Sequence, residues 1–167
     1  GSRGDRPGIS FAEALKEAQE LGYAEADPAF DIEGFDTAHK LAILASLSFG
    51  CEIAPDEIFV EGITKITAAD IKVAGDLGYA IKLLGIARRS AEGIEQRVHP
   101  TLVPKTSAVA AVDGVLNAIV LETDHVHELM LSGPGAGGAP TASSVLSDIL
   151  DIARGTRVPP LGVPSAD

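Results

Sequence analysis

The chain has 167 residues, of which 46% are hydrophobic and 22% charged, and this predicts one globular domain with a hydrophobic core. Its formal net charge of −11, from 24 acidic and 13 basic side chains, argues against a nucleic-acid surface or an anionic membrane face, since both need clustered Lys and Arg. The single cysteine, Cys51, excludes an internal disulfide, and no apolar run approaches the roughly 20 residues of a membrane span, so a cytoplasmic protein is expected.

The first part of the chain is predicted to be helical. A capping-box pattern begins a helix over residues 10–21, and an acidic loop over residues 23–34 follows it. Apolar residues then recur at helical spacing over residues 35–49, and Gly50 supplies a stop signal. We therefore expect a second, largely buried helix over residues 35–49.

The rest of the chain is predicted to be mostly strands. Strand patterns come in pairs separated by short polar turns, with one helix before the first pair and one after the second. This order predicts an α+β fold whose mostly antiparallel or mixed sheet has helices on one face. The expected elements are a short strand at 57–63, a helix at 68–79 capped by Thr67, strands at 80–89 and 93–104, strands at 114–123 and 125–133 around Asp124, and a helix at 140–155.

The segment that begins the second helix gathers acidic side chains around Lys40. Asp36 and Lys40 are four residues apart on the expected helix, so their side chains share one face. The spacing alone leaves an ordinary surface ion pair open, at ~0.3–0.5 kcal/mol. The apolar segment after Lys40 and the acids of the preceding loop favour another interpretation. Lys40 would be a positioned proton donor and acceptor, and carboxylates such as Glu25 and Asp31 could hold a substrate's ammonium group.

The glycine-rich sequence GPGAGG, residues 133–138, satisfies the pattern G-x-G-x-x-G. The dinucleotide-binding fingerprint also needs a βαβ unit around it, and the residues after Gly138 offer only one helix and a proline-rich tail. A complete nucleotide domain therefore cannot start here. The pattern still predicts a turn whose backbone closely approaches another group, such as a cofactor held mainly by another domain.

Two histidines have the spacing of a metal-ligand pair. His125 and His127 are two apart on an expected strand and would therefore lie on one face. Because the sequence suggests no third ligand, no metal is expected. Cys51 is interpreted as an inert, buried thiol.

Four segments, in order, resemble homoserine dehydrogenases. The sequence GYAEADPAFDIEGFDTAHKLAIL resembles the signature of this family. The similarity continues through ITAADIKVAGDLGYAIKLLGIA, HPTLVPKTSAVAAVDGVLNAI and GPGAGGAPTASSVLSDI. It covers roughly residues 8–154, nearly the whole chain.

The resemblance implies an NAD(P)-dependent oxidoreductase that reduces L-aspartate 4-semialdehyde to L-homoserine, on the route to threonine and methionine. Lys40 matches the catalytic lysine that gives and takes the proton of the substrate oxygen, and Asp36 matches the acid that positions it. Glu25, Asp31 and Tyr23 match residues that contact the substrate, with Glu25 recognising its ammonium group.

The resemblance does not extend to the Rossmann domain of the family or to its backbone sodium site. NADP or NAD is therefore expected to bind the full-length parent and not this chain alone, no metal is carried over, and the isolated chain is expected to be inactive. Gly133, Gly135, Gly137 and Gly138, with the helix that follows them, would return to the nucleotide domain and approach the cofactor.

The organisation expected from these arguments has four parts. Residues 1–7 are interpreted as the remnant of a cleaved tag, 8–132 as the substrate-binding and dimerisation domain, 133–154 as the turn and helix that return to the nucleotide domain, and 155–167 as a linker. The sheet is expected to pair with a second copy, because an exposed edge or face needs covering. Two alternatives share this fold: a non-catalytic amino-acid-binding module and a plain dimerisation module.

Overall fold

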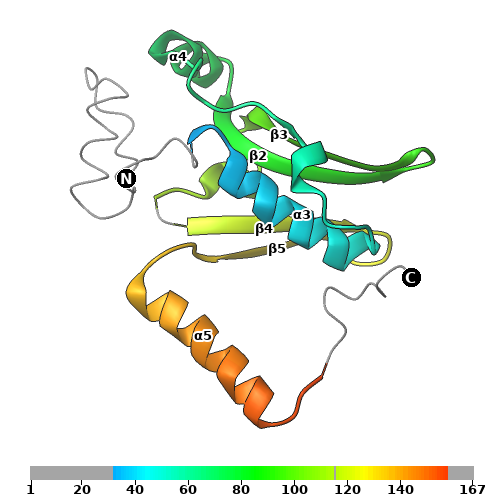
Figure 1. Ribbon diagram of the computed structural model, residues 1–167. Coiled ribbons are helices and arrows are strands. Elements are labelled where there is room, and N and C mark those ends of the chain that lie inside the picture. Colours follow the sequence, from blue (N-terminus) through cyan, green and yellow to red (C-terminus); the bar gives the residue numbers. More distant parts are fainter. Residues whose placement is uncertain (1–31, 115, 158–167) are drawn as a thin grey trace. The chain divides into compact units, whose positions relative to one another are not determined.

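The computed structural model describes residues 32–114 and 116–157 (Figure 1). Its described part divides into two compact units, one made of residues 32–77 and 81–102 and the other of residues 78–80 and 103–156. The helix expected over residues 10–21 and most of the acidic loop lie outside the described residues.

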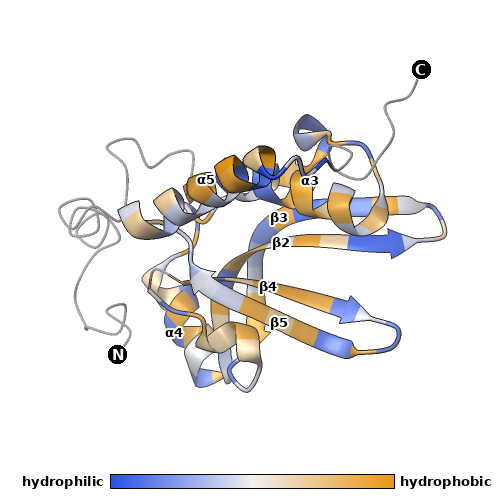
Figure 2. Ribbon diagram, turned by 90° about the horizontal axis from the view of Figure 1, so that it is seen from below, coloured by the Kyte–Doolittle hydropathy of each residue, from blue (hydrophilic) through white to orange (hydrophobic). Residues whose placement is uncertain are grey.

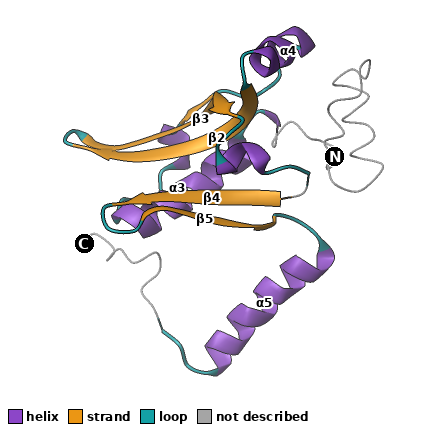
Figure 3. Ribbon diagram, turned by 180° about the vertical axis from the view of Figure 1, so that it is seen from behind, coloured by secondary structure: helices purple, strands orange, loops and turns teal. Residues whose placement is uncertain are grey.

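A three-stranded sheet organises the first unit. Its strands are β1 (Phe59–Val60), β2 (Tyr79–Ser90) and β3 (Gly93–Pro104), in the order β1-β3-β2. Figure 3 shows the two long strands, β2 and β3. β1 is parallel to β3, with Val60 opposite Val98, whereas β2 and β3 are consecutive strands joined by a tight turn. The sheet is therefore mixed, as expected. The strand expected at 57–63 is reduced to two residues, and the 3₁₀-helix η2 (Pro55–Glu57) precedes it.

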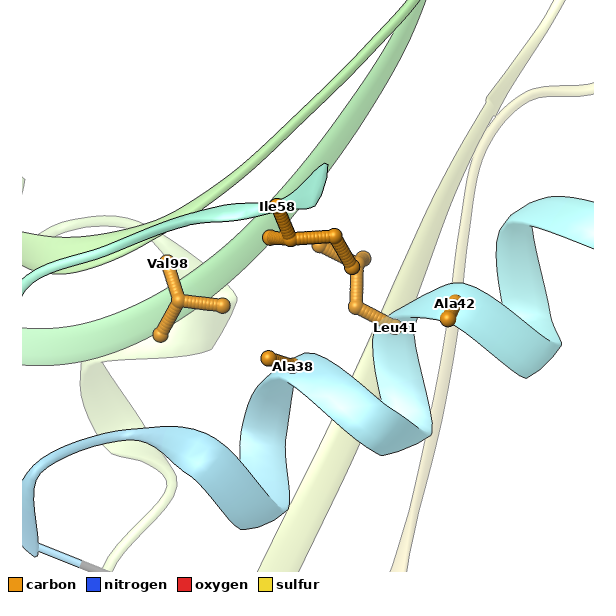
Figure 4. Packing of buried hydrophobic residues seen from close by; sticks show 5 residues of the cluster. All are labelled: Ala38, Leu41, Ala42, Ile58 and Val98. Carbon is orange, nitrogen blue, oxygen red and sulfur yellow. The ribbon is translucent and has the colours of Figure 1, made fainter. Parts of the chain in front are cut away.

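Helix α3 spans Phe35–Phe49, which confirms the predicted bounds. Gly50 ends it in the left-handed conformation, and its N–H donates to the Ser46 carbonyl at 2.9 Å. Small residues on the inner face let the helix approach the sheet closely, and Leu41 fills the remaining space (Figure 4). The core cluster comprises Ala38, Leu41, Ala42, Ile58 and Val98.

The outer face of α3 differs from the prediction. Phe35 and Leu47, expected to be buried, are 49% and 60% exposed. The apolar positions run around more of the helix than the sheet can cover, so the helix buries one face only. The pattern of apolar residues could not show how wide the covering surface would be.

Helix α4 (Ala68–Asp76) begins with the predicted Thr67 cap. The Asp70 N–H donates to Thr67 Oγ1 at 3.2 Å, and the Thr67 N–H donates to Asp70 Oδ2 at 2.9 Å, so the capping box is complete. The helix ends before Tyr79, its expected last residue, because Gly78 has a φ of 84° and β2 begins directly after it.

The capping box is expected to make the stability of the protein depend on pH in the acidic range. Hydrogen bonds from the Thr67 hydroxyl and the Thr67 N–H hold the pKa of Asp70 below its ordinary value of 3.8. Because the folded-state pKa is the lower one, this contribution is complete above the unfolded pKa and is lost as pH falls through the folded pKa. We expect the melting temperature of wild type, relative to Asp70→Asn, to fall as pH decreases from about 6 to about 2. Parallel melting curves over that range would contradict this.

The second unit contains a β-hairpin and a helix. β4 (Leu116–Thr123) and β5 (His127–Pro134) are antiparallel, with Leu121 opposite Leu129, and this confirms the strand pair predicted around Asp124. The 3₁₀-helix η3 (Ala108–Ala111) precedes the hairpin, and α5 (Gly138–Ala153) follows it.

Helix α5 displays an apolar surface (Figure 2). Five large apolar side chains on it are exposed: Val145, Leu146, Ile149, Leu150 and Ile152. The helix is nevertheless too short or too polar to cross a membrane, and the same holds for every other helix in the described part of the chain.

Candidate active site

The structure brings two of the predicted site residues together on α3. The Lys40 ammonium lies 2.6 Å from Asp36 Oδ2, and the pair spans one helical turn. Asp36 lies in the first turn, where a negative charge is favoured by the unpaired backbone N–H groups of the helix start. The Lys40 and Asp36 side chains are 55% and 36% exposed, so the pair is accessible to a ligand.

The energetics of this pair do not by themselves identify a function. An exposed i,i+4 ion pair contributes only ~0.3–0.5 kcal/mol to stability, and Lys72 and Asp76 form a similar pair on α4 at 2.7 Å. What the geometry adds is orientation: the carboxylate fixes the ammonium at one place on the helix. An ammonium held in this way can donate a proton to a developing alkoxide and, once neutral, can take it back.

Gly34 seats the beginning of α3 directly on the sheet. It is buried and adopts a φ of 87°, and a Cβ there would lie 3.0 Å from Val98 Cγ1 and 3.2 Å from Val60 Cγ1. Its carbonyl accepts the Ala38 N–H at 3.0 Å, the first bond of the helix. Gly34 was not among the site residues predicted from the sequence. The available signal was a glycine immediately before a helix that carries candidate site residues.

The predicted substrate contacts lie outside the described residues. Tyr23, Glu25 and Asp31 all belong to the segment before residue 32. The gathering of Glu25 and Asp31 around Lys40 therefore stays a prediction, whereas the position of Asp36 is described.

The predicted cofactor-binding glycines lie where β5 ends and α5 begins, in the second compact unit. Gly133 is the next-to-last residue of β5, Gly137 caps α5 with a φ of 126°, and Gly138 is its first residue. Among the described residues, no atom beyond the adjoining backbone lies within 4 Å of where a Cβ on Gly133 or Gly138 would be, so a side chain would meet open space there. In the described residues β4 and β5 are antiparallel and form no βαβ unit, so these glycines do not make up a complete dinucleotide-binding site, and their contact with a cofactor stays a prediction.

Gly135 makes the close approach that the glycine pattern predicted, and its neighbour is a side chain of this chain. A Cβ on Gly135 would lie 2.1 Å from Asn117 Nδ2 on β4. Because Asn117 is exposed and can change rotamer, we expect Gly135→Ala to lower the unfolding free energy by about 1 kcal/mol or less. In an Asn117→Ala background the same substitution should cost nothing measurable. Urea unfolding of the four proteins checks this, and an equal cost in both backgrounds would contradict it.

The predicted histidine pair does not share a strand face. His125 lies in the turn of the hairpin, and β5 begins only at His127, which has a φ of 62°. The expected strand began two residues too early, because the turn uses the Thr123 hydroxyl, which accepts the Val126 N–H at 3.1 Å. In the part of the chain that the structure describes, no three His, Cys, Asp or Glu side chains gather closely enough to hold a metal ion.

Comparison with known proteins identifies consistent relatives. A family model described as homoserine dehydrogenase matches residues 2–150. The homoserine dehydrogenase of Neisseria gonorrhoeae is 54% identical over 147 residues, which are 88% of this chain and 34% of that protein. The homoserine dehydrogenase of Mycobacterium tuberculosis is 48% identical over 155 residues, 90% of this chain and 35% of that protein. The chain thus spans about a third of the length of the curated relatives it matches.

Solved structures show the same fold. The crystal structure of a homoserine dehydrogenase from Thiobacillus denitrificans matches with a TM-score of 0.86 at 47% identity, over 96% of this chain and 40% of that one. A hyperthermophilic archaeal homoserine dehydrogenase in complex with NADPH matches with a TM-score of 0.69 at 33% identity, over 92% of this chain and 43% of that one.

Proposed function

Because the chain belongs to the homoserine dehydrogenase family, we propose that it is the substrate-binding and dimerisation part of an enzyme that interconverts L-aspartate 4-semialdehyde and L-homoserine in the cytoplasm. The observation that carries this proposal is the family match over residues 2–150, which includes the Lys40–Asp36 pair on α3. The complete reaction is assigned to a longer protein of about the length of the relatives, and the isolated chain is expected to be inactive.

The proposed role of Lys40 is proton transfer at the substrate oxygen. In the reducing direction the Lys40 ammonium donates a proton to the oxygen of the former aldehyde, and in the oxidising direction the neutral amine removes the hydroxyl proton of homoserine. Asp36, 2.6 Å from the Lys40 nitrogen, accepts a hydrogen bond from it and holds it in one orientation.

Substrate recognition is assigned to the segment before α3. Glu25 would accept hydrogen bonds from the ammonium group of the amino acid, and Asp31 and Tyr23 would complete the pocket. Only three residues separate Asp31 from the beginning of α3 at Phe35, so the chain length limits how far Asp31 can lie from Lys40, and this supports the assignment of Asp31.

The cofactor is assigned to NADP or NAD, held mainly by residues outside this chain. When bound, it supplies or accepts the hydride at the substrate carbon. Gly133, Gly135, Gly137 and Gly138 would approach it through their backbone. The exposed apolar residues of α5 support a return of this helix to the nucleotide-binding part of the longer protein, since they need a covering surface.

A homodimer formed through sheet faces is also proposed. On the β4–β5 hairpin, Leu129 and Leu131 alternate along one face, and both side chains are exposed. The residues opposite them across the hairpin, Leu121 and Ile119, are apolar as well. A second copy of the chain would cover this stripe.

The experiment that tests the proposed function uses the intact natural gene product. Reduction of NADP and of NAD would be followed by absorbance, with and without L-homoserine. Homoserine-dependent reduction of either cofactor is the expected result. A folded protein that binds homoserine without reducing a cofactor would favour the binding module instead, and one that does neither would favour the plain dimerisation module.

A further inference from the structure

Gly62 lies directly beneath the segment that leads into α3. A Cβ on Gly62 would be 2.6 Å from the Glu33 Cα and 2.6 Å from the Ile32 carbonyl oxygen, and 2.9 Å from Glu33 Oε2. Contacts under 3.0 Å are essentially never made by real Cβ atoms. Gly62 does not have a positive φ, so the glycine is required here for space and not for an unusual backbone conformation.

The residues around Gly62 join this leading segment to the sheet. The Glu61 N–H donates to the Val98 carbonyl of β3 at 2.8 Å, and the Ile63 N–H donates to the Ile32 carbonyl at 2.9 Å. Residues 61–63 therefore lie between β3 and the backbone of residues 32–33. These two hydrogen bonds, and the absence of a side chain at position 62, determine how closely residues 32–33 approach the sheet.

Gly34 contacts the same sheet from the next position along the chain. Its would-be Cβ lies 3.0 Å from Val98 Cγ1, so the turn before α3 contacts the sheet at Val98 and the segment after β1 at Gly62. The helix starts at Phe35, and its first backbone bond runs from Ala38 to Gly34. The position of these few residues therefore determines where the first two turns of the helix lie.

We infer that Gly62 is a positioning residue for the Lys40–Asp36 pair. With alanine at position 62, the backbone of residues 32–33 would have to move by about 0.8 Å to go from 2.6 Å to an ordinary contact distance of 3.4 Å. The two nearest atoms belong to the backbone, so a rotamer change cannot relieve the contact. Because α3 is a rigid rod, the displacement carries Asp36 and Lys40 with it. The catalytic consequence rests on the proposed function.

The expected effect is a loss of kcat in the intact protein carrying Gly62→Ala. A misplacement of about 1 Å of a catalytic group lowers the rate about 10²-fold, and we expect a loss of that order in homoserine oxidation. The KM for the nicotinamide cofactor, which is held mainly by another part of the protein, should change less than about twofold. This split separates a displaced lysine from a loosened cofactor site.

Gly50→Ala is the matched control. Gly50 ends the same helix with a φ of 70°, and in the described part of the chain no atom other than those of its own neighbours lies within 4 Å of its would-be Cβ. Alanine there introduces left-handed strain of about 1 kcal/mol without displacing another segment. Both proteins would be assayed well below their melting temperatures. Gly50→Ala should keep kcat within about twofold of wild type at a comparable loss of stability.

Amide hydrogen exchange supplies a readout that does not depend on activity. In Gly62→Ala, exchange should become faster at the Ile63 and Ala38 amides, whose hydrogen bonds run to Ile32 and Gly34, and should stay unchanged at the Gly50 amide. Gly50→Ala should give the opposite pattern. If the wild-type protein has no homoserine-dependent activity, the proposed function fails. The hydrogen-exchange result alone then decides whether Gly62 positions the beginning of α3.

Three results would overturn the inference. A kcat of Gly62→Ala within about twofold of wild type would do so, as would unchanged exchange at Ile63 and Ala38. Restoration of kcat by adding Glu33→Ala would assign the effect to a side chain and not to the backbone. Should Gly62→Ala not fold, Ile63→Pro removes the N–H that holds Ile32 without adding bulk at position 62. A wild-type kcat in a folded Ile63→Pro protein would then overturn the inference.

Discussion

Replacing Lys40 by alanine in the intact protein is expected to lower kcat for homoserine oxidation by about 10²- to 10⁴-fold. The proposed reaction moves a proton at the substrate oxygen, and among the described residues the Lys40 ammonium is the group that Asp36 holds in place, at 2.6 Å. Without it, water must serve as the base. Because the interaction is proposed to form in the transition state, kcat and kcat/KM should fall by similar factors.

The chain offers a matched control for this experiment. Lys72 and Asp76 form an i,i+4 ion pair on α4 at 2.7 Å, with side chains 76% and 65% exposed. Lys72→Ala removes the same type of pair with the same small effect on stability, ~0.3–0.5 kcal/mol, and should leave kcat unchanged. Steady-state kinetics of the three proteins, with folding checked by circular dichroism, decides the matter. Equal activity in wild type and Lys40→Ala would favour the non-catalytic binding module.

The sequence predicted most of the elements that local chemistry determines. The bounds of α3 follow from its apolar periodicity and from Gly50, and the beginning of α4 follows from the Thr67 capping box. The hairpin around Asp124 follows from two alternating segments and a polar turn. In each case the signal lies within a few residues of the feature that it predicts.

The errors arose where distant segments meet. Only two residues of the strand expected at 57–63 pair with β3, because the chain then bends at Ile63, whose N–H donates to the Ile32 carbonyl in the segment before α3. Gly62 carries no local sign of its role, and the only local sign at Gly34 is its place before a helix, since the space that both glycines leave is filled by residues far away in the sequence. The same reason explains the exposed outer face of α3.

The candidate site divides in the same way. The Lys40–Asp36 pair could be predicted from i,i+4 spacing, and the structure shows it formed. Its chemical role could not, because Lys72–Asp76 has the same spacing and a similar geometry. The resemblance of the surrounding segment to a family distinguished the two pairs.

The largest expected effect on stability comes from Leu41, the residue after Lys40. Its side chain is 7% exposed and packs between α3 and the sheet, in the cluster with Ile58 and Val98. The β2 backbone also approaches it: a Cβ on Gly85 would lie 3.5 Å from Leu41 Cδ1. Neighbours held in a helix and a sheet can close only part of the cavity. We therefore expect Leu41→Ala to lower the unfolding free energy by about 2–5 kcal/mol.

Leu47→Ala on the same helix makes the identical change at a position that is 60% exposed, and should cost about 1 kcal/mol or less. Urea unfolding of this chain and of both variants, followed by circular dichroism, measures the two costs. Burial alone predicts that Leu41→Ala costs about 2 kcal/mol or more beyond Leu47→Ala. A difference of that size would show that α3 is stabilised mainly by the packing of its inner face. Equal losses would mean that Leu47 is covered in solution, as it would be if a second copy of the chain packed against the outer face of the helix that carries Lys40.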